Sequence, residues 1–153
     1  MEWGLILAGL GAFIAAVVAG VGSAVWVGKA GQAVAGVVAE EPEKFGSLLI
    51  LQLLPGTQGV YGLIISFLIL TKIGVLGGAT PDFSLGLYYL IASLPIAIGG
   101  GLSAVAQGKA AVSSIALVAK RGEGFGNGML LTLMVETYAL FAFLISLIMV
   151  ISK

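Results

Sequence analysis

Long runs without a charged residue constrain this chain more than any other feature of its sequence. No charge occurs in residues 3–28, 45–71 or 83–108, and the last run, 124–152, contains only Glu136. A helix of 26 residues is about 39 Å long, which exceeds the roughly 30 Å of hydrocarbon in a bilayer. The pattern predicts four transmembrane helices, at approximately 4–38, 45–72, 84–119 and 125–151.

The composition excludes a soluble fold and several kinds of chemistry. Hydrophobic residues make up 59% of the 153 residues and charged residues 9%, against about a quarter in soluble domains. The uncharged runs are much longer than the about 9–11 residues of a barrel strand. The chain has no histidine, no cysteine and a net charge of zero, so imidazole, thiol and nucleic-acid chemistry are not expected. We expect an all-α membrane protein whose solvent is lipid.

The short connections between the runs predict the orientation. With four spans, the connections 40–44 and 120–124 lie on one side, and the connection 72–82 lies on the other with both termini. The first side carries five basic residues, counting Lys29 and Lys109 at nearby helix shoulders, and the second side carries two. The positive-inside rule therefore places the two hairpin loops in the cytoplasm. The start of the chain has no basic segment typical of a cleaved signal peptide.

The second half of the chain repeats the first half at an offset of 80 residues. One offset matches both helices and the loop of each copy without a gap. Matching pairs include Gly20 and Gly100, Ser23 and Ser103, Gly28 and Gly108, Lys29 and Lys109, Glu43 and Glu123, Phe45 and Phe125, Thr57 and Thr137, and Ser66 and Ser146. The repeat predicts two tandem helical hairpins, 1–80 and 81–153. Because each copy has two spans, both copies have the same orientation in the membrane.

The first helix of each copy is lined with small residues. In the first copy they recur every four residues, at Ala8, Ala12, Ala16, Gly20, Ala24 and Gly28. Small residues allow helix backbones to approach closely in lipid. A stripe of this length favours crowding on more than one face, as on the inner wall of a ring of identical subunits.

A glycine-rich segment in the first span resembles a nucleotide-binding loop but does not match one. The segment from Gly22 to Lys29 has one spacer residue too many, and Ala30 stands where serine or threonine holds magnesium. It also lies within a membrane helix. Direct nucleotide binding is therefore not expected.

Glu136 is the candidate functional residue because it lies near the middle of the last span. A charge at that depth costs at least about 2.5–3.5 kcal/mol on insertion scales. No lysine or arginine lies within a turn of mid-membrane, and Lys29 and Lys109 are expected to extend to the interface. A cation or a proton is therefore expected to neutralise the carboxylate.

The second span supplies polar groups at the same depth. Leu54, Thr57, Gln58 and Tyr61 fall at i, i+3, i+4 and i+7, which places them on one helical face. Pro55 cannot donate a backbone hydrogen bond, so a kink there can free carbonyl oxygens for an ion. The third span adds Gln107 at the position where the first copy has Val27, and Gly56 occupies the position that matches Glu136. One carboxylate therefore remains for four helices.

Four motifs resemble the proteolipid (K or c) subunit of V-type and A-type ATPases, in particular its sodium-pumping bacterial members. They are 41–46 (EPEKFG), 53–59 (LLPGTQG), 106–109 (AQGK) and 135–139 (VETYA). The resemblance covers essentially the whole chain. It implies a rotor ring of identical subunits, itself non-hydrolytic, turned by ATP hydrolysis elsewhere in the complex. Its partners would be a stator subunit with a basic residue and a central shaft seated on the cytoplasmic loops.

The resemblance also implies a sodium site. By position, Glu136 provides the charged ligand, and the remaining oxygens come from the carbonyl of Leu54, the hydroxyl of Thr57 and the amides of Gln58 and Gln107. Tyr61 would hydrogen-bond Glu136 and close the site, with Thr137 a possible helper. Sodium favours oxygen ligands, whereas a proton needs only the carboxylate, so the extra oxygens favour sodium. Protons could compete at low pH, and lithium could fit.

Two other classes of protein fit part of the pattern. A small four-helix antiporter coupled to a cation also has one buried acid, but such proteins carry it in the first helix and lack a parallel duplication. A purely structural protein with four spans would leave Glu136 among glutamine and threonine without an explanation.

Overall fold

The computed structural model describes residues 3–153, and every uncharged run folds into helix. Four helical segments in it are long and apolar enough to cross a membrane: Trp3–Val38, Pro42–Lys72, Phe83–Lys120 and Gly122–Ile151. The prediction of an all-helical membrane protein is confirmed. Within the described residues no strand forms beyond a single bridge between Ile73 and Gly78.

Two spans are continuous helices and two are interrupted. The first span is α1 (Trp3–Val38), and the fourth is α6 (Phe125–Ile151) after the short turn η4 (Gly122–Gly124). The second span comprises η1 (Pro42–Lys44), α2 (Phe45–Leu53), η2 (Leu54–Gly56) and α3 (Thr57–Lys72). The third span comprises α4 (Phe83–Pro95), η3 (Ile96–Gly100) and α5 (Gly101–Lys120). The expected spans 4–38, 45–72, 84–119 and 125–151 correspond to these in order.

Proline causes both interruptions, with different results. Pro55 lies in η2, which is a single 3₁₀ turn, as expected for a residue that removes a helical hydrogen bond. Pro95 ends α4 and is followed by η3, which is a π-helical turn. The backbone N–H of Ile96 there donates to the hydroxyl of Ser146 on α6, at 3.1 Å. The second interruption was not expected from the sequence.

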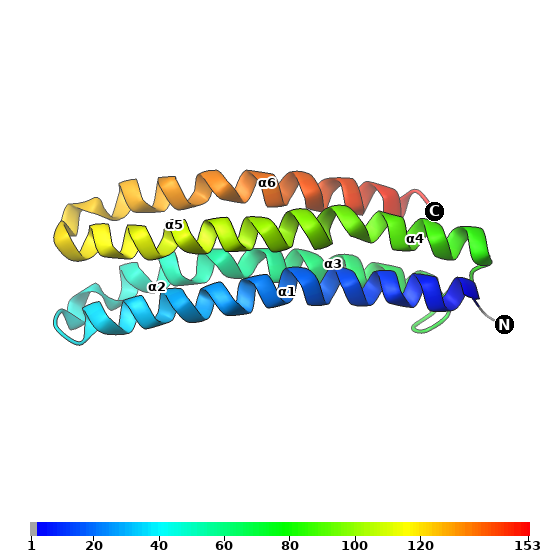
Figure 1. The fold of residues 1–153 in the computed structure, drawn as a ribbon, viewed down its shortest axis with the longest axis horizontal. Helices are drawn as coiled ribbons and strands as arrows, with labels where there is room; N and C mark the ends of the chain where they lie inside the picture. Colours follow the sequence, from blue (N-terminus) through cyan, green and yellow to red (C-terminus); the bar gives the residue numbers. More distant parts are fainter. Residues whose placement is uncertain (1–2) are drawn as a thin grey trace.

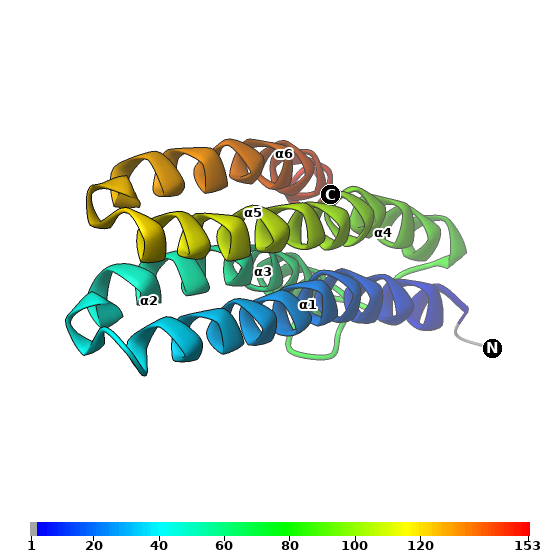
Figure 2. The same cartoon turned by 60° about the vertical axis from the view of Figure 1, so that its left-hand side comes forward.

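The spans form two hairpins that lie side by side with their loops at the same end (Figures 1 and 2). Helix α1 packs along α3 within its own hairpin and along α4 and α5 of the other, while α6 packs mainly against α5. The approach of α1 to the other hairpin is close: a Cβ at Gly22 would lie 2.9 Å from the carbonyl oxygen of Gly101. Small residues therefore hold the two hairpins together, as expected for helices packed in lipid.

The small-residue stripe of α1 serves this packing only over its first half. Ala8 and Ala12 are buried, whereas Ala24 and Gly28 are exposed. A Cβ at Gly20 or at Gly28 would meet nothing within 4 Å. The second half of the stripe is therefore an open surface of small residues on the single chain.

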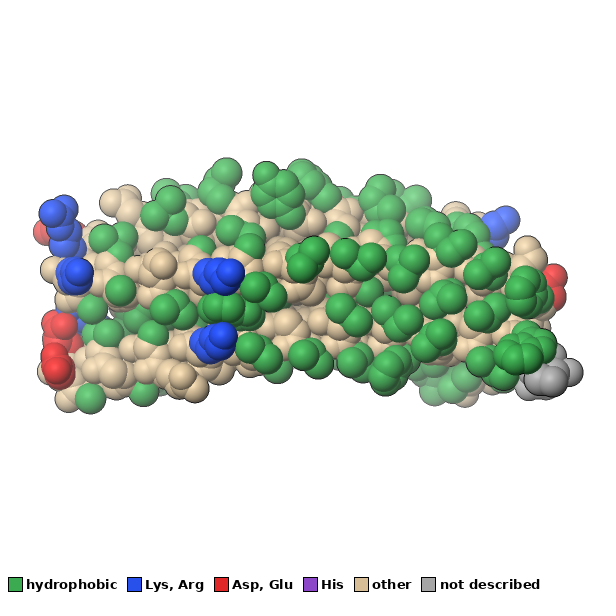
Figure 3. Space-filling model, viewed as in Figure 1, with side chains coloured by type: hydrophobic (Ala, Val, Ile, Leu, Met, Phe, Trp, Pro, Cys, Tyr) green, Lys and Arg blue, Asp and Glu red, His purple; other side chains and the backbone are tan. Residues whose placement is uncertain are grey.

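Charged side chains gather at the two ends of the molecule, and the surface between them is largely apolar apart from two basic side chains nearer the loop end (Figure 3). At the loop end, Lys44 forms an ion pair with Glu41 at 2.6 Å and donates to the carbonyl oxygen of Ala119 at 3.2 Å. Within the spans, Lys29 of α1 lies with its amine 4.2 Å from the centre of the Trp26 ring, and the amine of Lys109 is 6.0 Å away. These two lysines share one aromatic ring, which stabilises cations through its π face.

Candidate functional site

Glu136 lies between three spans near the middle of α6. Its relative exposure is 9%, which is low for a carboxylate. Within residues 3–153, the one ion pair is that of Lys44 with Glu41, at the end of the bundle. The buried carboxylate is therefore not neutralised by a basic side chain of the described chain.

Polar side chains from the other spans converge on the two oxygens of this carboxylate. Oε1 accepts a hydrogen bond from the hydroxyl of Tyr61 at 2.6 Å. Oε2 accepts from the hydroxyl of Thr57 at 2.8 Å and from the amide nitrogen of Gln107 at 2.8 Å. The amide nitrogen of Gln58 lies 3.4 Å from the same oxygen. The donors belong to α3 and α5, so all three spans are needed to form the site.

The 3₁₀ turn at Pro55 brings a backbone oxygen beside these groups. The carbonyl oxygen of Leu54 accepts the backbone N–H of Thr57 and lies 3.0 Å from the Thr57 hydroxyl. A hydroxyl has one hydrogen, so Thr57 donates either to Leu54 or to Glu136 at any moment. The three oxygens of Leu54, Thr57 and Glu136 therefore lie in one small cluster.

The two glutamines form a buried pair beside the carboxylate. The amide nitrogen of Gln58 donates to the amide oxygen of Gln107, and both side chains are fully buried. The amide nitrogen of Gln107 also lies 3.3 Å from the carbonyl oxygen of Thr132. The amide oxygen of Gln58 has no hydrogen-bond partner, a condition that costs about 1–3 kcal/mol for a buried acceptor. A cation among these oxygens would give this atom a partner.

Thr137 lies outside this cluster. Its hydroxyl donates to the carbonyl oxygen of Met134, one turn earlier in α6, at 2.9 Å, and the residue is exposed. The structure therefore does not bring Thr137 to Glu136 or to Tyr61. It does bring together Leu54, Thr57, Gln58, Tyr61, Gln107 and Glu136.

Sequence reasoning missed two residues that contact the site. Phe143 stacks on Tyr61, with ring centres 5.1 Å apart and an angle of 29° between the planes. Thr132 provides the backbone oxygen near Gln107, and it lies four residues before Glu136, on the same face of α6. This spacing could have indicated Thr132, whereas the contact of Phe143 with Tyr61 depends on how α3 and α6 pack.

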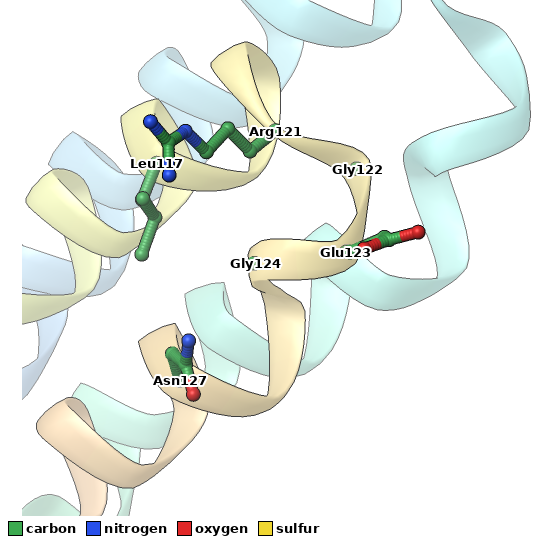
Figure 4. Close-up of a pocket in the computed structure, with 6 residues that line it drawn as sticks. All are labelled: Leu117, Arg121, Gly122, Glu123, Gly124 and Asn127. Atoms are coloured by element: carbon green, nitrogen blue, oxygen red, sulfur yellow. The ribbon is translucent and has the colours of Figure 1, made fainter.

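The second hairpin loop forms a separate open pocket of about 430 Å³ at the end of the bundle (Figure 4). It is lined by Leu117, Arg121, Gly122, Glu123, Gly124 and Asn127. In Figure 4 the side chain of Arg121 lies back along α5 towards Leu117, while Glu123 points to the opposite side. The loop therefore presents charges of both signs at the end of the bundle, distant from Glu136.

Comparison with known proteins identifies the family. The family of the ATP synthase C subunit matches residues 10–69 and again residues 90–149, and the second match begins 80 residues after the first. The chain belongs to this family. It is 46% identical over 151 residues to the V-type sodium ATPase subunit K of Enterococcus hirae, covering 97% of this chain and 93% of that protein. It is 38% identical over 149 residues to the A-type ATP synthase subunit K of Methanocaldococcus jannaschii, covering 96% of this chain and 63% of that protein.

These relationships confirm the resemblance seen in the sequence. The double match agrees with the duplicated hairpin and with its offset of 80 residues. The predicted class of function, a membrane rotor subunit of a rotary ATPase, is confirmed with the family. The small antiporter is not supported, because both relatives are subunits of ATPases or ATP synthases.

Proposed function

We propose that Glu136 carries one sodium ion per subunit across the membrane as a ring of identical subunits turns. Five groups would bind the ion: the carboxylate of Glu136, the carbonyl of Leu54, the hydroxyl of Thr57 and the amide oxygens of Gln58 and Gln107. Sodium is the cargo of the site, and a proton or lithium would compete for it.

One observation carries this proposal: a buried carboxylate without a basic partner lies beside an amide oxygen that has no hydrogen-bond partner. The amide oxygen belongs to Gln58 and the carboxylate to Glu136. A proton on Glu136 would neutralise the acid but would use only one of the oxygens gathered here. A hard cation such as sodium would neutralise the acid and also bind the amide oxygen of Gln58, because it takes oxygen ligands of mixed charge. The name of the relative from Enterococcus hirae, a sodium ATPase subunit, supports the same ion.

Binding requires only side-chain rotations. The hydroxyl of Thr57 donates to Glu136, which leaves its own lone pairs and the remaining lone pair of the Leu54 carbonyl free for the ion. Half-turns of the terminal amides of Gln58 and Gln107 bring their oxygens to the ion in place of their nitrogens. Tyr61 keeps its hydrogen bond to the other carboxylate oxygen and closes the site from that side.

The neutral loaded site explains how the ring can turn in lipid. A carboxylate that holds a sodium ion has no net charge, so it can pass the hydrocarbon without the cost of a bare charge. At the stator, a basic residue of another subunit would attract Glu136 and release the ion. Moving one charge against 100 mV requires about 2.3 kcal/mol, which rotation would supply.

The remaining surfaces of the chain would contact the rest of the complex. The open half of the small-residue stripe suits the inner wall of the ring, where neighbouring helices crowd. The hairpin loops carry more basic residues than the opposite end, so they would lie in the cytoplasm and seat a central shaft, with both termini on the far side. The subunit itself would hydrolyse no ATP and bind no nucleotide.

Carbodiimide labelling of isolated rings tests the ion. Dicyclohexylcarbodiimide reacts with a buried carboxyl group, so Glu136 should be modified, and sodium near neutral pH should slow the reaction. Labelling that responds to pH but not to sodium would indicate a proton carrier instead. A native mass no larger than a small oligomer would refute the ring.

Glutamine variants test the ligands. Gln58→Leu or Gln107→Leu should raise the sodium concentration that half-protects Glu136 by about 10- to 150-fold, since a bond to a charged group contributes about 1.5–3 kcal/mol. Gln52→Leu, in the same span but outside the site, should leave it unchanged. Equal losses of sodium protection and ring assembly would assign the two site glutamines to packing.

A further inference from the structure

The internal repeat predicts a second ion-site position in each chain, and the chain does not provide it with a carboxylate. At the offset of 80, Gly56 matches Glu136 and Val27 matches Gln107. In the structure these two residues are also neighbours, because a Cβ at Gly56 would lie 3.4 Å from a methyl carbon of Val27. The first hairpin therefore keeps these two positions side by side but has glycine in place of the acid and valine in place of the amide.

The remaining groups of this second position lie on the opposite face of the molecule. In the site around Glu136, α3 and η2 supply Leu54, Thr57, Gln58 and Tyr61. Their matches at the offset of 80 are Met134, Thr137, Tyr138 and Phe141 of α6. All four are exposed, and the relative exposures of Met134, Tyr138 and Phe141 are 67%, 68% and 62%. Within one chain this face of α6 cannot reach Gly56, so a second copy must bring it there.

We infer that α6 of a neighbouring copy packs onto the first hairpin in the register that α3 has on the second hairpin, and that its Tyr138 fills the space left by the missing carboxylate at Gly56. This inference rests on the proposed ring. It adds the contact that joins the copies and the reason why every second position holds no ion.

The sizes of the residues are complementary at this contact. The ion site pairs Glu136 with Gln58. At the second position, the matching pair is Gly56 of one copy and Tyr138 of its neighbour. Apart from its own turn of helix, the methyl carbon of Val27 is the one atom of residues 3–153 within 4 Å of a Cβ at Gly56, so the position has room on that side. Tyr138 is held at the surface by an edge-to-face contact with Phe141, at 6.3 Å between ring centres.

The direction of the repeat makes this contact continue from copy to copy. The two hairpins have the same orientation, so the exposed face of the second hairpin corresponds, through the repeat, to the face of the first hairpin that is buried against the second. Contacts of this head-to-tail kind close into a ring when the rotation between copies closes. The interface between the hairpins of one chain then serves as the template for the interface between chains.

Cysteine crosslinking tests the register, because the chain has no cysteine of its own. The inference places the Tyr138 side chain between the two backbones, so the two thiols need a spacer and not a direct disulfide, which requires Cα atoms about 4.4–6.8 Å apart. In rings of the double variant Gly56→Cys, Tyr138→Cys, a short bifunctional maleimide should give a ladder of covalent dimers, trimers and larger species on denaturing gels. The matched pair Gly56→Cys, Ile145→Cys moves the second cysteine seven residues, about 10.5 Å along the same helix, and should stay monomeric.

Several results would overturn the inference while leaving the proposed function intact. They are intact rings without a ladder, a crosslink within one chain, or an equal ladder from the Ile145 pair. Rings that fail to form in the unmodified protein would instead refute the ring itself.

A photoreactive residue covers the case in which the cysteine pair blocks assembly. p-Benzoylphenylalanine in place of Tyr138 keeps an aromatic ring at the position. On illumination it should attach to the tryptic peptide 45–72 of the neighbouring copy, which contains Gly56. Attachment to lipid alone would mean that this face of α6 lies against the bilayer and would overturn the inference.

Discussion

Removing the hydroxyl of Tyr61 tests the closing of the site with the smallest change in structure. The Tyr61→Phe substitution deletes the donor that lies 2.6 Å from Oε1 of Glu136 and keeps the ring that stacks on Phe143. This is the one hydrogen bond that Oε1 accepts among the described residues, and the other donors bind Oε2. The substitution therefore leaves one oxygen of a buried carboxylate without a partner.

The expected size of the effect follows from the geometry. A hydrogen bond to a charged group contributes about 1.5–3 kcal/mol, and each 1.4 kcal/mol changes an equilibrium constant about tenfold. Sodium should therefore half-protect Glu136 of the Tyr61→Phe ring at a concentration about 10- to 150-fold higher than in the unmodified ring. Without sodium, carbodiimide should label the variant faster, because the carboxylate leaves its closed position more often.

The measurement is the rate of labelling of Glu136 in isolated rings at a series of sodium concentrations. Tyr88→Phe is the matched control, since it removes a hydroxyl that donates to the carbonyl oxygen of Met149, thirteen residues beyond Glu136 in α6. It should change neither the half-protective concentration nor the rate without sodium. If Tyr61→Phe rings are intact and their half-protective concentration lies within twofold of the unmodified value, Tyr61 does not hold the site closed.

Three further changes probe the surroundings of the site. Phe143→Leu removes the ring stacked on Tyr61. It should raise the half-protective sodium concentration about 2- to 10-fold, since an aromatic pair contributes about 0.5–1.5 kcal/mol. An unchanged value would show that the stacking does not position Tyr61. Gly128→Val would put a Cβ atom 2.9 Å from the Cβ of Ser114 and force α5 and α6 apart. Rings of this variant should dissociate at a lower temperature in detergent. Dissociation at the same temperature as the unmodified rings would contradict the close packing. Lys44→Met should speed amide hydrogen exchange in the first hairpin loop without changing sodium protection, and unchanged exchange would mean that Lys44 does not hold the loop.

The spans could be predicted from the sequence because they depend on where charge is absent. A charged residue is costly in hydrocarbon wherever the helix lies, so the uncharged runs indicate the spans without knowledge of packing. Most of the candidate site followed from helical spacing together with the repeat. Residues at i, i+3, i+4 and i+7 share a face, and the structure brings Leu54, Thr57, Gln58 and Tyr61 to Glu136.

Features that depend on contacts between spans could not be predicted in the same way. Pro55 and Pro95 both interrupt a helix, but one gives a 3₁₀ turn and the other a π-helical turn. At the second, the hydroxyl of Ser146 accepts the N–H of Ile96, and a proline alone does not indicate such a partner on another helix.

The small-residue stripe of α1 does not stay on one face of the helix along the whole span. Residues four apart are separated by about 400° around a helix of 3.6 residues per turn, so the stripe drifts by about 40° at each step. It begins buried at Ala8 and Ala12 and emerges on the surface at Ala24 and Gly28. A pattern interpreted as one face therefore serves two different surfaces.

The contacts of Lys44 have a mechanical consequence. This side chain joins the first hairpin loop, through Glu41, to the end of α5, through the carbonyl of Ala119. A sideways force applied to either loop is therefore shared by both hairpins instead of bending one of them. A torque received at this end of the bundle would therefore pass from one hairpin to the other through the Lys44 side chain.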